Sequence, residues 1–218
     1  MFSGSAYNDP DIRREVILEE YLRVVGVGGT LRENSASLGA LRQALKGAEK
    51  AEAETMLLDL QELRLPMYEP ESSLEEYGPE VRRFVKEIRE ADALILSTAA
   101  YHGTLAGVTK NALDFLQFLA RDERPYLEDR VVGLISTAGG DLAAANANSA
   151  MVHTVHALRG IVAPMMVAVP KAWRKSENGE IVDPDPIERL ERLGGLVVDL
   201  TQKLNDAPGQ QRADRSAA

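Results

Sequence analysis

Small polar residues follow an apolar run near the start of the chain, and their types suit the binding of an anion. The apolar residues 24–27 end at Gly28 and Gly29, after which hydroxyl and amide side chains lead into a helix-forming segment. The free N–H groups of a first helical turn, together with the helix dipole, favour a negative charge at that point. The turn is therefore predicted to hold a phosphate. Further donors would come from the side chains of Thr30, Arg32, Asn34, Ser35 and Ser37.

Two widespread nucleotide motifs fit this turn poorly. Gly26 and Gly28 would begin a dinucleotide-binding fingerprint, but Leu31 stands where that motif has its third glycine. No lysine follows a second glycine at the spacing of a P-loop, which disfavours nucleoside triphosphates. A glycine turn with a serine or asparagine helix cap is common in α/β proteins, so a purely structural turn remains the alternative.

The composition excludes several kinds of chemistry. The 218 residues include no cysteine, so disulfides and thiol nucleophiles are excluded and redox chemistry would need a bound cofactor. The net charge of −9 argues against a nucleic-acid partner, and the three histidines form no metal-ligand pattern. No apolar run has membrane-spanning length, and residues 1–20 lack the apolar block of a signal peptide. These features predict a cytoplasmic protein with no metal site and no membrane partner.

Strand-like and helix-like segments alternate along the chain. Short apolar runs predict strands near residues 22–27, 55–60, 93–97, 130–136 and within 161–169. Apolar residues three and four apart predict helices from the phosphate turn to about residue 47 and near residues 79–91, 108–121, 142–159 and 185–204. Prolines and glycines predict a long loop at residues 63–80. We expect an N-terminal extension at 1–20, one domain at 21–206 and a disordered tail at 207–218.

This alternation predicts an α/β fold with a five-stranded parallel sheet and helices on both faces. Ligands of such sheets bind beyond the carboxyl ends of the strands, where the strand order reverses. Loops of small residues follow the first, third and fourth strands, at residues 28–35, 98–103 and 137–141. In a flavodoxin-like three-layer sandwich with strand order 2-1-3-4-5, these loops would meet at one edge and form a nucleotide site.

Three segments resemble the NADPH-dependent FMN reductase family, a flavodoxin-like group of flavoproteins. Residues 29–37, GTLRENSAS, are similar to the phosphate loop G-S-x-R-x-x-S-x-N, with Thr30 in place of Ser and Ser37 in place of Asn. Residues 98–114, TAAYHGTLAGVTKNALD, resemble the segment that wraps the flavin ring, with Ala99 and Ala100 in place of Pro and Glu. Residues 136–140, STAGG, match the glycine-rich loop beside the ring.

The resemblance implies an FMN-dependent oxidoreductase in which NADPH or NADH is the hydride donor. Electrons would pass to a small acceptor such as a flavin, a quinone, an azo compound or a metal oxyanion. The implied FMN contacts beyond the phosphate loop are Thr98, Ala99, Ala100, Tyr101, His102, Gly103, Ser136, Thr137, Ala138, Gly139 and Gly140. No catalytic side chain is assigned, because the cofactor carries out the hydride chemistry.

The resemblance also implies a homodimer or homotetramer. The apolar helices that carry Phe115 and Phe118 are candidates for the subunit contact. Trp173, in the loop after the fifth strand, is expected to pack in the core or at its rim, with the covering of a neighbouring site as the alternative.

Three other functions remain open from the sequence. A non-enzymatic flavodoxin-like electron carrier would share the acidic charge, although the turn lacks the T-x-T-G-x-T phosphate loop of flavodoxins. A Rossmann-type dehydrogenase would use Gly26, Gly28 and Asp59, but Asp59 lies further than the usual spacing of about twenty residues. A receiver-like binding module would need clustered acidic residues after the first strand, and residues 26–30 contain none.

Overall fold

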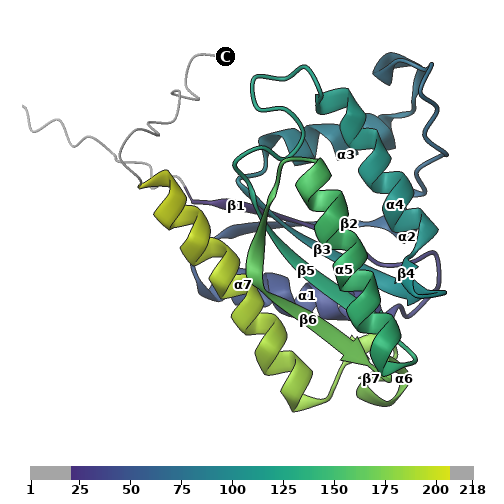
Figure 1. Cartoon of the computed structure of the whole chain (residues 1–218), viewed down its shortest axis with the longest axis vertical. Coiled ribbons are helices and arrows are strands. Elements are labelled where there is room, and N and C mark those ends of the chain that lie inside the picture. The colour runs from purple at the N-terminus through teal and green to yellow at the C-terminus, as the bar shows by residue number, and fades with distance from the viewer. Residues whose placement is uncertain (1–20, 207–218) are drawn as a thin grey trace, which may run out of the picture.

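Five parallel strands form the centre of the sheet in the order β2-β1-β3-β5-β6, which confirms the predicted flavodoxin-like order (Figure 1). The computed structural model describes residues 21–206. The bounds of these strands are β1 Arg23–Gly28, β2 Glu54–Asp59, β3 Ala93–Tyr101, β5 Val131–Ala138 and β6 Ile161–Pro170. β3 and β5 are central and buried on both faces, which accounts for their nearly continuous apolar sequence.

The helices cover the sheet in two layers. α1 (Ala36–Lys50) and α7 (Pro184–Asn205) pack on one face, against a core that includes Val24, Ile95 and Ile135. α3 (Pro79–Glu90), α4 (Gly107–Asp114), the 3-10 helix η2 (Phe115–Leu119) and α5 (Asp141–Ala157) cover the other face. Apolar side chains therefore pack on both faces of the sheet. In folds of this kind, ligands bind at the edge formed by the loops that follow the carboxyl ends of the strands.

Several segments differ from the sequence prediction. The expected loop at residues 63–80 contains the end of α2 (Leu60–Leu63) and the 3-10 helix η1 (Leu74–Glu76). The expected helix at 108–121 divides into α4 and η2. The expected loop at 98–103 is mostly β-structure, because β3 continues to Tyr101 and pairs with the antiparallel strand β4 (Thr104–Leu105). After β6, α6 (Ala172–Lys175) leads into a hairpin of β7 (Ser176–Glu177) and β8 (Glu180–Ile181), which was not predicted.

Phe115 cannot provide the subunit contact that was expected of it. Its side chain is fully buried and packs edge to face on Tyr68 and Tyr77, with ring centroids 5.5 and 5.1 Å apart. Phe118 is only half-buried and packs on the same tyrosines. Phe115 thus belongs to the apolar spacing of this segment because it packs within the domain.

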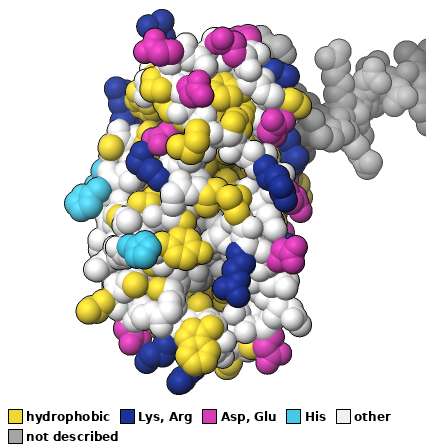
Figure 2. All heavy atoms as spheres, turned by 90° about the vertical axis from the view of Figure 1, so that its right-hand side faces the viewer, with side chains coloured by type: hydrophobic (Ala, Val, Ile, Leu, Met, Phe, Trp, Pro, Cys, Tyr) yellow, Lys and Arg dark blue, Asp and Glu magenta, His cyan; other side chains and the backbone are white. Residues whose placement is uncertain are grey.

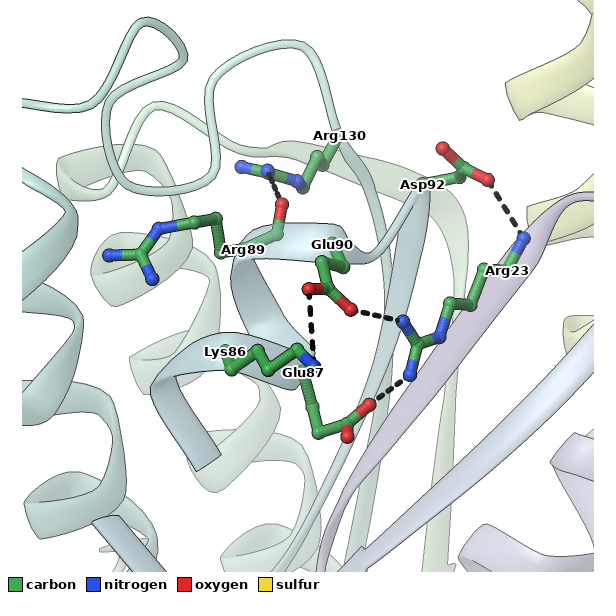
Figure 3. Close-up of polar contacts among 7 residues, drawn as sticks. All are labelled: Arg23, Lys86, Glu87, Arg89, Glu90, Asp92 and Arg130. Atoms are coloured by element: carbon green, nitrogen blue, oxygen red, sulfur yellow. Dashed lines mark hydrogen bonds and ion pairs between the residues drawn. The ribbon is translucent and has the colours of Figure 1, made fainter. Parts of the chain in front are cut away.

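A polar network closes the end of the sheet opposite the loop edge (Figure 3). The guanidinium of Arg23, at the start of β1, contacts the carboxylates of Glu87 and Glu90 on α3, the latter at 2.8 Å. The backbone N–H of Arg23 donates to Asp92 Oδ2 at 2.8 Å, and Asp92 N–H donates back to the carbonyl of Arg23 at 2.9 Å. These contacts join the first residue of β1 to the connection between α3 and β3.

The expectations for residues 1–20 and 207–218 concern parts of the chain outside the described residues. Within residues 21–206, the helices are either too short or too polar to span a bilayer. The same part of the chain contains no group of three or more histidine, aspartate or glutamate side chains that could hold a metal ion.

Candidate functional site

A cavity of about 500 Å³ lies at the carboxyl ends of β1, β3, β5 and β6. This volume falls within the range of small-molecule and cofactor sites. The three loops singled out in the sequence contribute to its wall, together with a fourth segment after β6. The lining residues are Thr30, Arg32, Asn34, Ser35, Ala36, Ser37, Ala99, Ala100, Tyr101, Thr137, Ala138, Gly139, Ala172, Trp173, Ser176, Asn178 and Gly179.

The phosphate loop, residues 29–37, presents a chain of three hydroxyl groups to this cavity. Thr30 Oγ1 donates to Ser35 Oγ at 3.3 Å, and Ser35 Oγ lies 2.9 Å from Ser37 Oγ. The three side chains are buried, with exposed fractions of 6%, 8% and 1%. Hydroxyl groups can donate as well as accept, so the chain can turn its hydrogens toward an anion.

The backbone around these hydroxyl groups also has a conformation suited to an anion. Gly29 has a φ of +92°, in the region that favours glycine, and lets the chain leave β1 sharply. Ser35 caps α1 by position but makes no side-chain capping hydrogen bond. The first N–H groups of α1 are therefore not occupied by the Ser35 hydroxyl, and a ligand could accept from them. Arg32 lines the same cavity with an exposed side chain.

The segment expected to wrap the flavin ring is a β-hairpin with a two-residue turn. His102 and Gly103 form the turn, with φ values of +51° and +82°, between the paired residues Tyr101 and Thr104. Thr98 links the hairpin to the residues that follow it. Its hydroxyl accepts a hydrogen bond from Ala106 N–H at 3.0 Å and lies 2.9 Å from Thr109 Oγ1. These hydrogen bonds tie the hairpin to the start of α4, at a place where Ala99 and Ala100 stand instead of the proline and glutamate of the resembled family.

The glycine-rich loop joins β5 to α5 on the opposite side. Thr137, Ala138 and Gly139 line the cavity, and a Cβ placed on Gly139 or Gly140 would meet no atom within 4 Å. Backbone N–H groups in such an open turn are accessible to a ligand. Ser136 is fully buried and its hydroxyl donates to the carbonyl of Ala144 at 2.7 Å, which holds α5 against the end of β5.

The structure brings most of the predicted cofactor residues to the cavity wall. The exceptions have other places: Thr98 and Ser136 are buried beneath the wall, and His102, Gly103 and Gly140 are exposed at turns beside it. His102 lies in the turn of the β3–β4 hairpin and does not line the cavity. Asp59, the acidic residue of the dehydrogenase alternative, caps α2 by accepting from Gln61 N–H at 2.8 Å.

The fourth wall of the cavity was missed from the sequence. It consists of Ala172, Trp173, Ser176, Asn178 and Gly179, from α6 and the β7–β8 hairpin. Trp173 is 66% exposed and lines the cavity, so of the two placements expected, core or rim, the core is wrong. A signal for the hairpin was present, because the dipeptide Asn178-Gly179 is typical of two-residue hairpin turns and both residues have positive φ, +48° and +85°.

Known proteins resemble this chain in both sequence and fold. Residues 22–174 match the sequence model of a family described as NADPH-dependent FMN reductase. The chain is 32% identical over 99 residues to an NAD(P)H-dependent FMN reductase of Pseudomonas aeruginosa, a match that covers 45% of this chain and 51% of that protein. It is 28% identical over 138 residues to an FMN-dependent NADPH-azoreductase of Staphylococcus haemolyticus, covering 62% of this chain and 69% of that protein. The chain thus spans about half the length of the first of these relatives.

Among solved structures, the chain is similar to FerB, a flavoenzyme NAD(P)H:(acceptor) oxidoreductase from Paracoccus denitrificans. The TM-score is 0.65 at 21% identity, and the superposition covers 84% of this chain and 98% of that one. At this level of identity the likeness concerns the fold, and it agrees with the flavodoxin-like strand order.

Proposed function

The chain belongs to the NADPH-dependent FMN reductase family, whose sequence model matches residues 22–174, and on that premise we propose that it is an FMN-dependent NAD(P)H oxidoreductase. It would take a hydride from NADPH or NADH onto FMN and pass electrons to a small acceptor. The observation that carries this proposal is the placement of a buried hydroxyl chain, at the start of α1, in one cavity with the ring hairpin and the glycine loop.

The phosphate of FMN would occupy the turn at residues 29–37. Thr30, Ser35 and Ser37 supply hydroxyl donors there, and the first turn of α1 adds backbone N–H groups and the positive end of its dipole. Arg32 adds a positive charge from the solvent side of the same cavity. Such a set of donors suits the dianionic phosphate of a mononucleotide.

The ring of FMN would lie between the hairpin of β3 and β4 and the glycine-rich loop. Tyr101 is 51% exposed on the cavity side and offers an aromatic face or edge. When bound, FMN supplies the hydride-accepting ring, and the protein contributes position, electrostatics and exclusion of water. Open backbone N–H groups near Gly139 and Gly140 would stabilise negative charge at the polar edge of the ring.

The electron acceptor and the oligomeric state of the protein are also proposals. The curated relatives are named for the reduction of FMN and of azo compounds, which supports a small acceptor such as a flavin, quinone, azo compound or metal oxyanion. We also propose a cytoplasmic homodimer or homotetramer. Figure 2 shows hydrophobic side chains in a discontinuous band down the side that carries α4 and β4, which is compatible with a contact between subunits.

A visible spectrum and a turnover assay test the function together. We expect the purified protein, after incubation with FMN and removal of excess, to show flavin absorption and to oxidise NADPH when an acceptor is added. A protein that stays colourless and gives no response when FMN is titrated in would overturn the proposal. Bound FMN without NADPH or NADH oxidation would favour the electron carrier instead.

A further inference from the structure

A basic and aromatic segment follows β6 at the cavity that the proposed function assigns to FMN. Residues 171–175 read KAWRK, in a chain whose net charge is −9. Trp173 lines the cavity and is 66% exposed, and the guanidinium carbon of Arg174 lies 4.6 Å from the centroid of its ring. Lys171 pairs with Asp141 at 3.4 Å, whereas Arg174 and Lys175 form no ion pair with any residue from 21 to 206. Positive charge is therefore available beside the indole.

The backbone of this segment is held in place on both sides. Pro170 pairs with Ala138 at the end of β5, next to the glycine-rich loop. Ser176 Oγ donates to the carbonyl of Ala172 at 2.8 Å, and Val182 N–H donates to the carbonyl of Lys175 at 2.9 Å. The indole thus lines the cavity from a hydrogen-bonded turn, and the guanidinium of Arg174 lies against the indole.

The chemistry of this pair suits a second ligand better than FMN. FMN carries one phosphate, and the hydroxyl groups and N–H groups at the start of α1 already provide for it. The hydride donor carries an adenine ring, a pyrophosphate and, in NADPH, a further phosphate on the adenosine ribose. A guanidinium binds such a phosphate through two parallel hydrogen bonds, and an indole provides a face on which adenine can stack.

We propose that Trp173 and Arg174 form the subsite for the adenosine half of the hydride donor, and that Arg174 selects NADPH over NADH. Trp173 stacks on the adenine, and Arg174 turns from the indole to the 2′-phosphate. This inference rests on the proposed function, because it needs a dinucleotide to reach FMN held in the same cavity. It goes further by naming the residues that set the preference between the two donors.

Kinetics and calorimetry on the FMN-loaded protein test the proposal. Arg174→Gln should raise the KM for NADPH at least about tenfold, because the 2′-phosphate loses its charged hydrogen-bond partner, and change the KM for NADH less than about twofold. The effect should fall on KM rather than on kcat. The same variant should weaken the calorimetric binding of 2′,5′-ADP about tenfold, while Trp173→Ala should weaken 2′,5′-ADP and 5′-AMP alike. Arg192→Gln is the matched control, since Arg192 is exposed on α7 and does not line the cavity.

The outcomes separate this inference from the function on which it rests. If the variants bind FMN and retain the unaltered KM values and 2′,5′-ADP affinity, the subsite is overturned and the FMN reductase function stands. A loss of FMN affinity in Trp173→Ala, with 2′,5′-ADP binding unchanged, would place the indole against the flavin and also overturn the subsite. If the visible spectrum shows that the unsubstituted protein binds no FMN, the proposed function is overturned, and the subsite is overturned with it.

Discussion

Gly179, in the turn of the β7–β8 hairpin, lies directly against Asn34 of the phosphate loop. A Cβ placed on Gly179 would be 2.7 Å from both the Cα and the carbonyl carbon of Asn34. Gly179 has a φ of +85°. A Cβ placed on Gly39 of α1 would overlap the carbonyl oxygen of Gly179. The hairpin and the turn at residues 29–37 are therefore packed as one unit, although Asn34 and Gly179 are 145 positions apart in the chain.

Replacing Gly179 with alanine should disturb both stability and binding. The new Cβ collides with backbone and the residue keeps an unfavourable φ, so we expect a loss of about 1–3 kcal/mol in the free energy of unfolding. FMN should bind more weakly because the phosphate loop must shift. Thermal unfolding and an FMN titration measure the two effects. Gly195→Ala on α7, where a Cβ comes no closer than 3.8 Å to a neighbour, is the control and should be neutral or stabilising. Undiminished FMN affinity in Gly179→Ala would show that the two segments are independent.

Removing the guanidinium of Arg32 should weaken FMN binding by about 1.5–3 kcal/mol, the range of a hydrogen bond to a charged group. Arg32 lines the cavity beside the buried hydroxyls, and its side chain has no carboxylate partner within residues 21–206. A fluorescence titration of FMN against Arg32→Ala measures the change. Arg83→Ala, an exposed arginine on α3, controls for the loss of one positive charge. Equal affinities in the two variants would remove Arg32 from the phosphate site.

Asn111 should matter for stability and not for the cofactor. Its side chain is nearly buried, accepts from Tyr68 N–H at 2.9 Å and donates to the carbonyl of Pro66 at 2.7 Å. Asn111→Ala leaves both backbone groups without these partners, which should cost about 1–3 kcal/mol and lower Tm by roughly 2–4 °C per kcal/mol. Calorimetric unfolding measures the loss, with the exposed Asn146→Ala on α5 as control. A Tm equal to that of the control would contradict this role.

A substitution of Arg23, at the end of the sheet opposite the cavity, should lower stability without changing FMN binding. Arg23→Met removes the contacts with Glu87 and Glu90 and leaves the two carboxylates facing each other (Figure 3). We expect a loss of about 1–3 kcal/mol in the free energy of unfolding, chiefly from the contact with Glu87, because the side chains of Arg23 and Glu87 are mostly buried whereas that of Glu90 is 42% exposed. FMN affinity should not change, since Arg23 and the phosphate loop lie at opposite ends of β1. Chemical denaturation tests the first statement, and a drop in FMN affinity at 25 °C would disprove the second.

Acid should loosen the 3-10 helix η1 through one carboxylate. The backbone and hydroxyl of Ser73 hydrogen-bond to Glu76 and lower the pKa of its carboxyl below the usual value. A lowered pKa in the folded state means that the stabilisation is present above the unfolded-state pKa and is lost as the pH falls through the folded-state pKa. An NMR titration of the Glu76 side chain should therefore give a pKa below that of an unstructured peptide. Ser73→Ala removes the hydroxyl and keeps the backbone N–H, so it should raise this pKa only part of the way to the peptide value, and an unchanged pKa in this variant would show that the hydroxyl does not contribute.

The sequence by itself predicted the alternation of parallel strands and helices and singled out the turn at residues 29–37, whereas the strand order was predicted with the family resemblance. The alternation and the turn depend on local patterns: a buried apolar run, a glycine turn at Gly28 and Gly29, and hydroxyl residues at the start of a helix. The alternation of such strands and helices permits few topologies, because parallel strands need crossover helices and their carboxyl ends share one edge. The resemblance to a known family then indicated which loops surround the ligand.

Only the tertiary structure decided the rest of the site. The exposure of Trp173, the packing of Gly179 on Asn34 and the burial of Phe115 all depend on contacts between segments that are far apart in the chain. The same apolar or aromatic residue type can line a core, a rim or a cavity, and its own sequence neighbourhood does not distinguish them. The fourth wall of the cavity exists because β6 ends beside β5 and the hairpin after it folds back onto α1, a relationship in space that no local pattern encodes.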